Sequence, residues 1–114
     1  MTVRYTGGMR DVELTLKAAR VLRAFLEDPA RPRYGFDLMK ATGMASGTLY
    51  PMLARFEAAG WLARGREGID PREAGRAPRL HYTMTEEAIP VARARLAAIS
   101  AELSGEPPRE QEQI

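Results

Sequence analysis

Two short segments, about thirty residues apart, constrain this chain more than any other feature of its sequence. The first, Ser46-Gly47-Thr48-Leu49-Tyr50-Pro51, opens a stretch with the periodicity of an amphipathic helix. The second, Gly75-Arg76-Ala77-Pro78-Arg79-Leu80-His81-Tyr82, is basic and leads into an alternating pattern typical of a strand. Together they predict a helix able to enter a groove of DNA, followed by a basic hairpin.

The helix predicted to end at Gly60 has two distinct faces, because successive residues on a helix are about 100° apart. One face is apolar and must be buried against a core, and it carries Leu49, Met52, Leu53 and Phe56. The outward stripe carries Thr48, Pro51 and Arg55, with Tyr50 on a flank beside Glu57. Ala54 and Ala58 leave the outer surface low, which allows a partner to approach closely.

The start of this helix has two candidate N-caps. Ser46 is a suitable residue type, but as the cap it would place Pro51 just past the first turn, where the missing N–H costs a hydrogen bond. Thr48 as the cap would avoid that cost. A surface helix without any function remains the alternative for such a short stretch taken alone.

The neighbouring segments favour a winged helix-turn-helix. Residues 34–43 read as a short helix closed by Gly43, and Met44 and Ala45 join it to the next helix. Residues 61–66 and 80–84 alternate like two short strands. The predicted fold class is therefore mainly α with a small β-hairpin, as a winged helix-turn-helix with a C-terminal dimerisation helix.

Three motifs in register resemble the PadR-like winged-helix transcriptional regulators: YGFDLMKATG, SGTLYPMLARFEAAGWL and GRAPRLHYTMTEEA. The resemblance covers about residues 12–100. It implies a homodimer, held largely by the last helix against the partner's first helix, and a repressor that releases its promoter when an effector binds.

The chain departs from the pattern of that family at four places. Leu80-His81 stands where the family is more basic or aromatic, the wing tip is longer and more acidic, Pro90 lies within the last helix, and there is no long C-terminal domain. The last departure indicates the compact subgroup of the family, and the first two concern the contacts of the wing.

We expect one small domain with two flanking segments. The expected division is a flexible N-terminal segment at 1–9, the winged helix-turn-helix at 10–84, the dimerisation helix at 85–103 and a disordered tail at 104–114. The first helix is predicted from Arg10 to Glu27, with an apolar core face and a second apolar strip that a partner helix could cover. That core face comprises Leu14, Ala18, Val21, Leu22 and Phe25, and the second strip comprises Val12, Leu16, Ala19 and Leu26.

The last helix is predicted to begin after Thr85, which we interpret as its N-cap with Glu86 and Glu87 in the positive first turn. Pro90 near its start allows a kink there. Its apolar stripe is longer than a monomer of this size can bury, and it consists of Ile89, Ala92, Leu96, Ile99 and Leu103. This stripe predicts a homodimer.

Charge is distributed unevenly although the net charge is only +2. Residues 31–81 hold nine basic and five acidic side chains, whereas residues 82–114 hold three basic and six acidic ones. The basic excess coincides with the predicted DNA-reading unit. Of the 17 basic residues all but Lys17 and Lys40 are Arg, which suits bidentate contacts to phosphate or guanine, although a GC-rich coding bias explains the count equally well.

Catalysis finds little support in the sequence. The chain contains no cysteine and a single histidine, His81, within a predicted strand. We therefore expect no enzyme activity, no metal and no cofactor. No apolar run is long enough for a membrane span, so we expect a cytoplasmic protein without membrane contact.

The predicted DNA-binding residues come from the two helices of the motif and from the wing, namely Tyr34, Ser46, Thr48, Tyr50, Pro51, Arg55, Arg76, Arg79 and His81. Residues 67–76 are expected to form a tip loop without structure of its own, held away from DNA or disordered. The alternative to a homodimer that binds double-stranded DNA is a winged-helix protein-protein interaction module with weak or no DNA binding, which the acidic tip keeps open. A small-molecule effector is not indicated, because the aromatic side chains that would stack on it are scarce.

Overall fold

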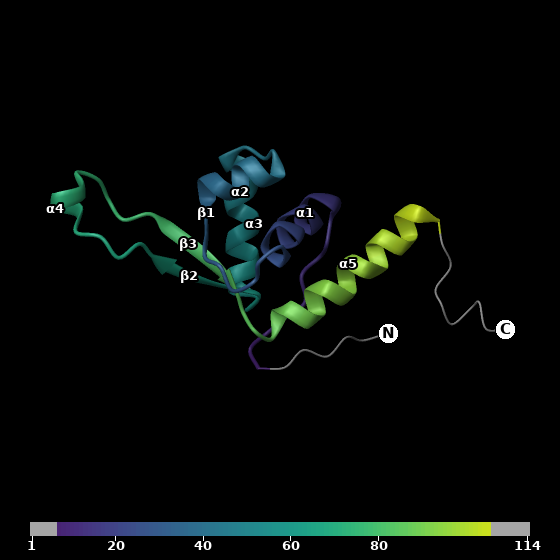
Figure 1. Cartoon of the computed structure of the whole chain (residues 1–114). Helices are drawn as coiled ribbons and strands as arrows, with labels where there is room; N and C mark the ends of the chain where they lie inside the picture. Colours follow the sequence, from purple (N-terminus) through teal and green to yellow (C-terminus); the bar gives the residue numbers. More distant parts are fainter. Residues whose placement is uncertain (1–6, 106–114) are drawn as a thin grey trace.

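The computed structural model describes residues 7–105 and has the predicted mainly α architecture, with a small antiparallel sheet (Figure 1). In chain order the elements are α1 (Leu16–Leu26), β1 (Arg33–Tyr34), α2 (Gly35–Thr42), α3 (Ser46–Ala58), β2 (Leu62–Arg66), α4 (Pro71–Ala74), β3 (Leu80–Met84) and α5 (Ala88–Ser104). The sheet has the strand order β1-β3-β2, so the predicted hairpin is joined by a strand that the sequence did not predict. In β1, Arg33 pairs with Tyr82 and Tyr34 pairs with His81.

Helix α1 begins six residues later than predicted. Thr15 is its N-cap, and the Thr15 hydroxyl accepts a hydrogen bond from the Ala18 N–H at 3.1 Å. The segment before it follows the body of the protein instead: the Arg10 N–H donates to the Ala59 carbonyl at 2.8 Å, and the Trp61 indole N–H donates to the Arg10 carbonyl at 2.7 Å. These long-range bonds compete with helix formation and hold residues 10–14 outside the helix.

The segment expected to be flexible, residues 1–9, ends on a buried side chain. Met9 is only 7% exposed and belongs to the core. Its backbone lies against Gly60, whose φ of 83° and lack of a Cβ permit the close approach. Residues 1–6 lie outside the described residues.

The turn between α2 and α3 has the predicted form. Gly43 caps α2 in the left-handed conformation, with φ of 72°, and its N–H donates to the Met39 carbonyl at 2.8 Å. Helix α3 buries the predicted stripe of Leu49, Met52, Leu53 and Phe56. The N-cap is Ala45, so the assignment of that role to Ser46 or Thr48 was wrong.

Pro51 therefore lies within the second turn of α3. A proline there has no N–H for the carbonyl four residues earlier, which belongs to Gly47. Gly47 is exposed, so water can bind that carbonyl. The hydrogen bond that Pro51 cannot donate is therefore missing at a carbonyl that water can reach.

The hydrophobic core lies between α1, α2, α3, the base of the sheet and the first turns of α5. Its largest fully buried side chains are Trp61, Phe25, Phe56, Leu22, Leu38, Leu49, Leu53 and Val21. Trp61 is fully buried, with its ring centroid 5.6 Å from that of Phe56.

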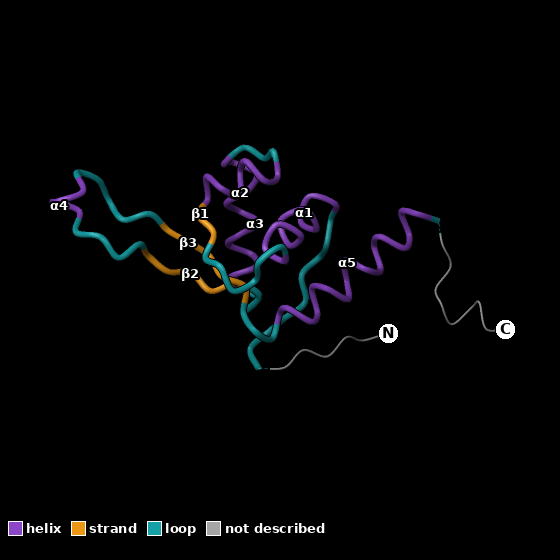
Figure 2. Tube along the Cα trace, viewed as in Figure 1, coloured by secondary structure: helices purple, strands orange, loops and turns teal. Residues whose placement is uncertain are grey.

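The wing projects from this body as a long hairpin of β2 and β3 (Figures 1 and 2). Its register pairs Leu62 with Met84 and Arg66 with Leu80. The strands match the prediction closely, whereas the tip does not. It contains the helical turn α4, capped by Asp70, whose side chain accepts from the Arg72 N–H at 2.9 Å. The expectation of a tip without structure was wrong, because an Asp-Pro start and Gly75 at the end provide a complete short helix.

Helix α5 runs away from the body, and Figure 2 shows its C-terminal half extending past α1. Thr85 is not its N-cap: the Thr85 hydroxyl donates to the Gly60 carbonyl at 2.8 Å, and the helix starts three residues later with Glu87 as cap. Pro90 consequently lies in the first turn, where no helical bond is lost. Of the expected tail at 104–114, Ser104 ends the helix, Gly105 caps it, and residues 106–114 lie outside the described residues.

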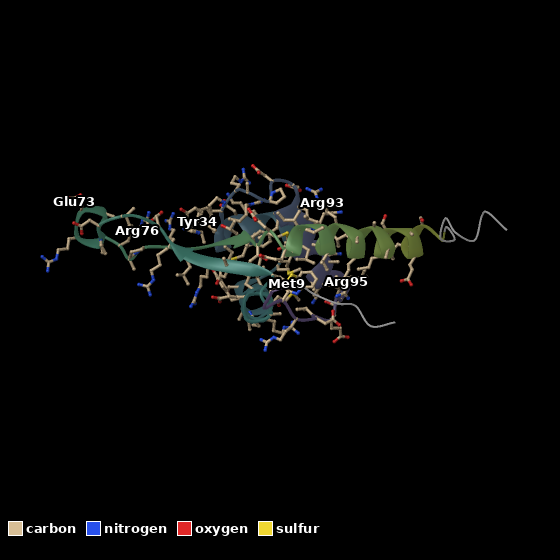
Figure 3. All side chains as sticks on the ribbon, turned by 90° about the horizontal axis from the view of Figure 1, so that it is seen from below. Met9, Tyr34, Glu73, Arg76, Arg93 and Arg95 are labelled. Atoms are coloured by element: carbon tan, nitrogen blue, oxygen red, sulfur yellow. The ribbon has the colours of Figure 1, made fainter. Side chains whose placement is uncertain are left out.

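Arg95, near the middle of α5, joins this helix to the segment that precedes α1. Arg95 forms an ion pair with Asp11 at 2.7 Å and donates to the Val12 carbonyl at 3.1 Å. Its guanidinium also lies 6.0 Å from the centre of the Trp61 ring. Figure 3 labels Arg95 on the first half of α5.

Candidate nucleic-acid interface

The outward face of α3 carries small and polar side chains. Ser46, Pro51 and Arg55 are exposed, and Thr48 is half-buried. Within residues 7–105, Arg55 forms no ion pair. An unpaired guanidinium beside a low surface can reach a base edge or a phosphate.

Tyr50 has a second role that the sequence did not predict. Its ring is 42% exposed, yet its hydroxyl occupies the space that a Cβ on Gly35 would need. Gly35 is the first residue of α2 and is buried. Tyr50 therefore sets the packing of α3 against the start of α2 as well as presenting an edge to solvent.

A row of side chains crosses the sheet on one face. His81 and Tyr34 are cross-strand partners, with their rings 5.7 Å apart in an edge-on arrangement, and Gly65 faces His81 from the other side. His81 is half-buried and packs against both neighbours. This packing gives His81 a structural role within the wing.

The row continues to α2 through Phe36. Its ring stacks on that of Tyr34 at 5.8 Å between centroids, with an interplanar angle of 19°. Phe36 is 46% exposed, and the Arg79 guanidinium lies 5.1 Å from the ring centre. Phe36 was not predicted as part of this surface, because nothing in the sequence places residue 36 beside residue 79.

The two wing arginines named from the sequence differ in their surroundings. Arg76 forms an ion pair with Glu67 at 2.7 Å and a second bond between the other nitrogen and oxygen at 3.2 Å. The hydrogen bond from Arg76 holds the pKa of the Glu67 carboxyl below its usual value. Arg79 has no ion pair within the described part of the chain. In Figure 3, Tyr34, Arg76 and Glu73 follow one another from the base of the wing to its tip.

Other cations surround this surface. Arg64 is paired with Glu57 of α3 at 3.3 Å, and both side chains are partly exposed. Arg66 and Arg72 are exposed, and neither forms an ion pair within residues 7–105. The helix α3 and the wing thus each present guanidinium groups without an ion pair within the described residues, and they extend from α3 to the wing tip.

A groove lies on the opposite part of the molecule, between α1 and α5. Its volume is about 540 Å³, and it is lined mostly by apolar side chains that include Leu16, Leu96, Ile99 and Leu103. Leu16 is 58% exposed and Leu103 is 70% exposed. Part of the predicted second strip of α1 and part of the α5 stripe therefore meet here, whereas Ala19 is largely buried.

Other kinds of site lack support within residues 7–105. These residues contain no group of three or more His, Cys, Asp or Glu side chains placed to hold a metal ion. None of the helices described is long and apolar enough to cross a membrane.

Comparison with known proteins identifies relatives by structure. No protein-family model matches the chain, and no curated protein matches it by sequence. Among solved structures it is similar to AbfR of Staphylococcus epidermidis, at 28% identity and a TM-score of 0.62, over 85% of this chain and 58% of that one. A structure of reduced AbfR bound to DNA matches at 30% identity and a TM-score of 0.61, over 77% of this chain and 59% of that one.

A PadR-like transcription factor from Bacteroides fragilis matches at 20% identity and a TM-score of 0.58, over 79% of this chain and 88% of that one. At that identity the match speaks for the fold alone. The chain spans about three fifths of the length of AbfR. The chain therefore has the fold of the winged-helix transcription regulators, and its motifs resemble those of the PadR-like ones.

Proposed function

We propose that this protein is a sequence-specific DNA-binding transcriptional regulator that acts as a homodimer, as a repressor, on an inverted repeat in duplex DNA. The main support for the proposal is that the exposed face of α3 and the basic wing belong to one structural unit. An exposed helix face with an unpaired Arg55 lies beside a projecting hairpin that carries Arg66, Arg72 and Arg79. Such a unit fits a helix in the major groove with phosphate contacts on either side.

The groove between α1 and α5 supports the dimer. Leu16 and Leu103 expose large apolar surfaces on two helices that line one groove, and Figure 1 shows the distal half of α5 extending away from the body. A second copy would cover both helices with the same surface, as a two-fold interface requires. Two copies would then present two α3 helices to two half-sites, and binding both together raises the affinity steeply.

The relatives agree with this proposal, because AbfR has been solved on DNA and the Bacteroides protein is named a transcription factor. The groove also contains Arg20 and Arg23, but no aromatic side chain lines it, so we do not assign an effector to it. We propose no enzyme activity and no cofactor.

The test is binding of the purified protein to the DNA upstream of its own gene, by footprinting over a range of salt concentrations. We expect protection of two half-sites about one helical turn apart, with an affinity that falls linearly in log-log form as salt rises. Binding to no duplex at low salt would instead favour the alternative, a winged-helix module that contacts other proteins.

A further inference from the structure

We call the part of the hairpin where residues 67 and 79 face each other the neck of the wing. Three charged side chains come together there. Glu67 and Arg79 lie directly opposite each other, because the Glu67 N–H donates to the Arg79 carbonyl at 2.9 Å and continues the ladder beyond β2 and β3. Arg76 returns from the tip to the same place. Two arginines thus lie near one carboxylate, and the structure shows which of them it binds.

Glu67 binds Arg76 through both of its oxygens. One nitrogen of the guanidinium donates a hydrogen bond to one carboxylate oxygen at 3.2 Å, and the other nitrogen lies 2.7 Å from the second oxygen as an ion-pair contact. The Glu67 side chain is only 18% exposed, whereas that of Arg76 is 38% exposed. The pair therefore closes the neck of the hairpin below α4.

Arg79 is held by different contacts. Its guanidinium lies over the exposed ring of Phe36, which is stacked on Tyr34, which in turn packs against His81. A cation over an aromatic face keeps its N–H donors available at the rim. The row of rings thus orients Arg79 without using its hydrogen bonds.

We propose that Arg79, held over Phe36, is the phosphate-contacting arginine of the wing neck, and that Glu67 withholds Arg76 from DNA. This inference rests on the proposed DNA binding. It assigns different roles to Arg76 and Arg79, which the sequence does not distinguish. It also adds Phe36 and Glu67 to the residues that set the affinity for DNA.

The reason is the balance of charge when DNA binds. If Arg76 left Glu67 for a phosphate, the free carboxylate would face the same negatively charged backbone. Electrostatic binding to duplex DNA depends on the number of phosphates that are neutralised, so a neutral pair adds nothing to that number. Arg79 forms no ion pair within the described residues, so a contact from Arg79 to a phosphate does add to that number.

Four variants and one control variant test this assignment on the footprinted duplex and on a scrambled duplex. Arg79→Gln should lower the affinity for both, by roughly eightfold at about 0.1 M salt, and reduce the salt slope by about 0.9, as expected for one lost phosphate contact. Phe36→Leu keeps apolar bulk but removes the π-face, so it should lower the affinity roughly two- to fivefold.

Glu67→Gln frees Arg76, so it should raise the affinity for both duplexes and steepen the salt slope by up to about 0.9. The matched control is Glu73→Gln, which removes the same charge from an exposed residue of α4. It should change the affinity less than Glu67→Gln. Thermal melting of each variant verifies that the wing change has not unfolded the domain.

The double variant Glu67→Gln with Arg76→Gln decides between the two arginines, because it leaves the net charge unchanged. We expect the salt slope of the wild-type protein. A slope reduced as much as in Arg79→Gln, or equal effects of Glu67→Gln and Glu73→Gln, would overturn the inference while leaving DNA binding intact. A wild-type protein that binds neither duplex would overturn the proposed function itself, and the inference with it.

Discussion

The imidazole ring of His81 occupies the space in which a side chain at Gly65 would have to lie. A Cβ placed on Gly65 would be 2.5 Å from one ring carbon of His81 and 3.1 Å from the nearest ring nitrogen. His81 cannot easily move aside, because Tyr34 packs against its other side. The width of the wing base therefore depends on a glycine in β2.

Gly65→Ala should destabilise the fold by about 1–3 kcal/mol, as other overpacked sites do. Thermal or urea denaturation measures the effect. The matched control is Gly68→Ala, since nothing lies within 4 Å of a Cβ there. Equal melting temperatures for the two variants would show that the His81 ring can move aside without a loss of stability.

Arg55→Ala should weaken binding to the footprinted site by about 1–3 kcal/mol if the arginine reads a base edge. Binding to a scrambled duplex should change much less. Arg93→Ala is the control, because Arg93 is also exposed but lies on α5 (Figure 3). If Arg55→Ala binds the site with unchanged affinity, the proposal that α3 contacts the bases is wrong.

If the protein forms the proposed homodimer, Leu103→Glu should give monomers in sedimentation experiments, because it puts a charge into the groove between α1 and α5. Leu103 is 70% exposed, so the fold of the monomer should be unaffected. Leu96→Glu should act in the same way from within the groove. Ala98→Glu adds the same charge on an exposed position of α5 that does not line the groove. Dissociation by Ala98→Glu as well would indicate a different interface.

Deletion of residues 68–73 should leave folding and dimerisation intact. The deleted residues are exposed apart from the half-buried Ile69, and the net charge changes by +1 because Asp70, Arg72 and Glu73 are lost together. We expect a stability change below about 1 kcal/mol, typical of surface changes, and a modest change in DNA affinity. A collapse of the melting temperature would mean that α4 supports the core.

The parts of the fold set by local periodicity could be predicted from the sequence. The buried stripe of α3, the glycine cap at Gly43 and the strand over residues 80–84 all follow from patterns within a dozen residues. The short strand β1 could not, because two residues carry no periodicity. The start of α1 was misplaced because the bonds from Arg10 and Trp61 join segments about fifty residues apart.

The candidate site was predicted by residue type but not by geometry. Arg76 and Arg79 read alike in the sequence, and only the path of the hairpin brings Glu67 against one and Phe36 against the other. Tyr50 and His81 were named as DNA contacts, and both also hold neighbouring elements in place through contacts with glycines. Such shared roles depend on tertiary packing and leave no periodic signal.

The ratio of affinities for the footprinted site and for a scrambled duplex of equal length, at physiological salt, tests the central claim most directly. If α3 reads base edges while the wing contacts phosphates, the ratio should be about 10³ or more, as for other specific regulators. A ratio near one at every salt concentration would contradict sequence recognition by this helix.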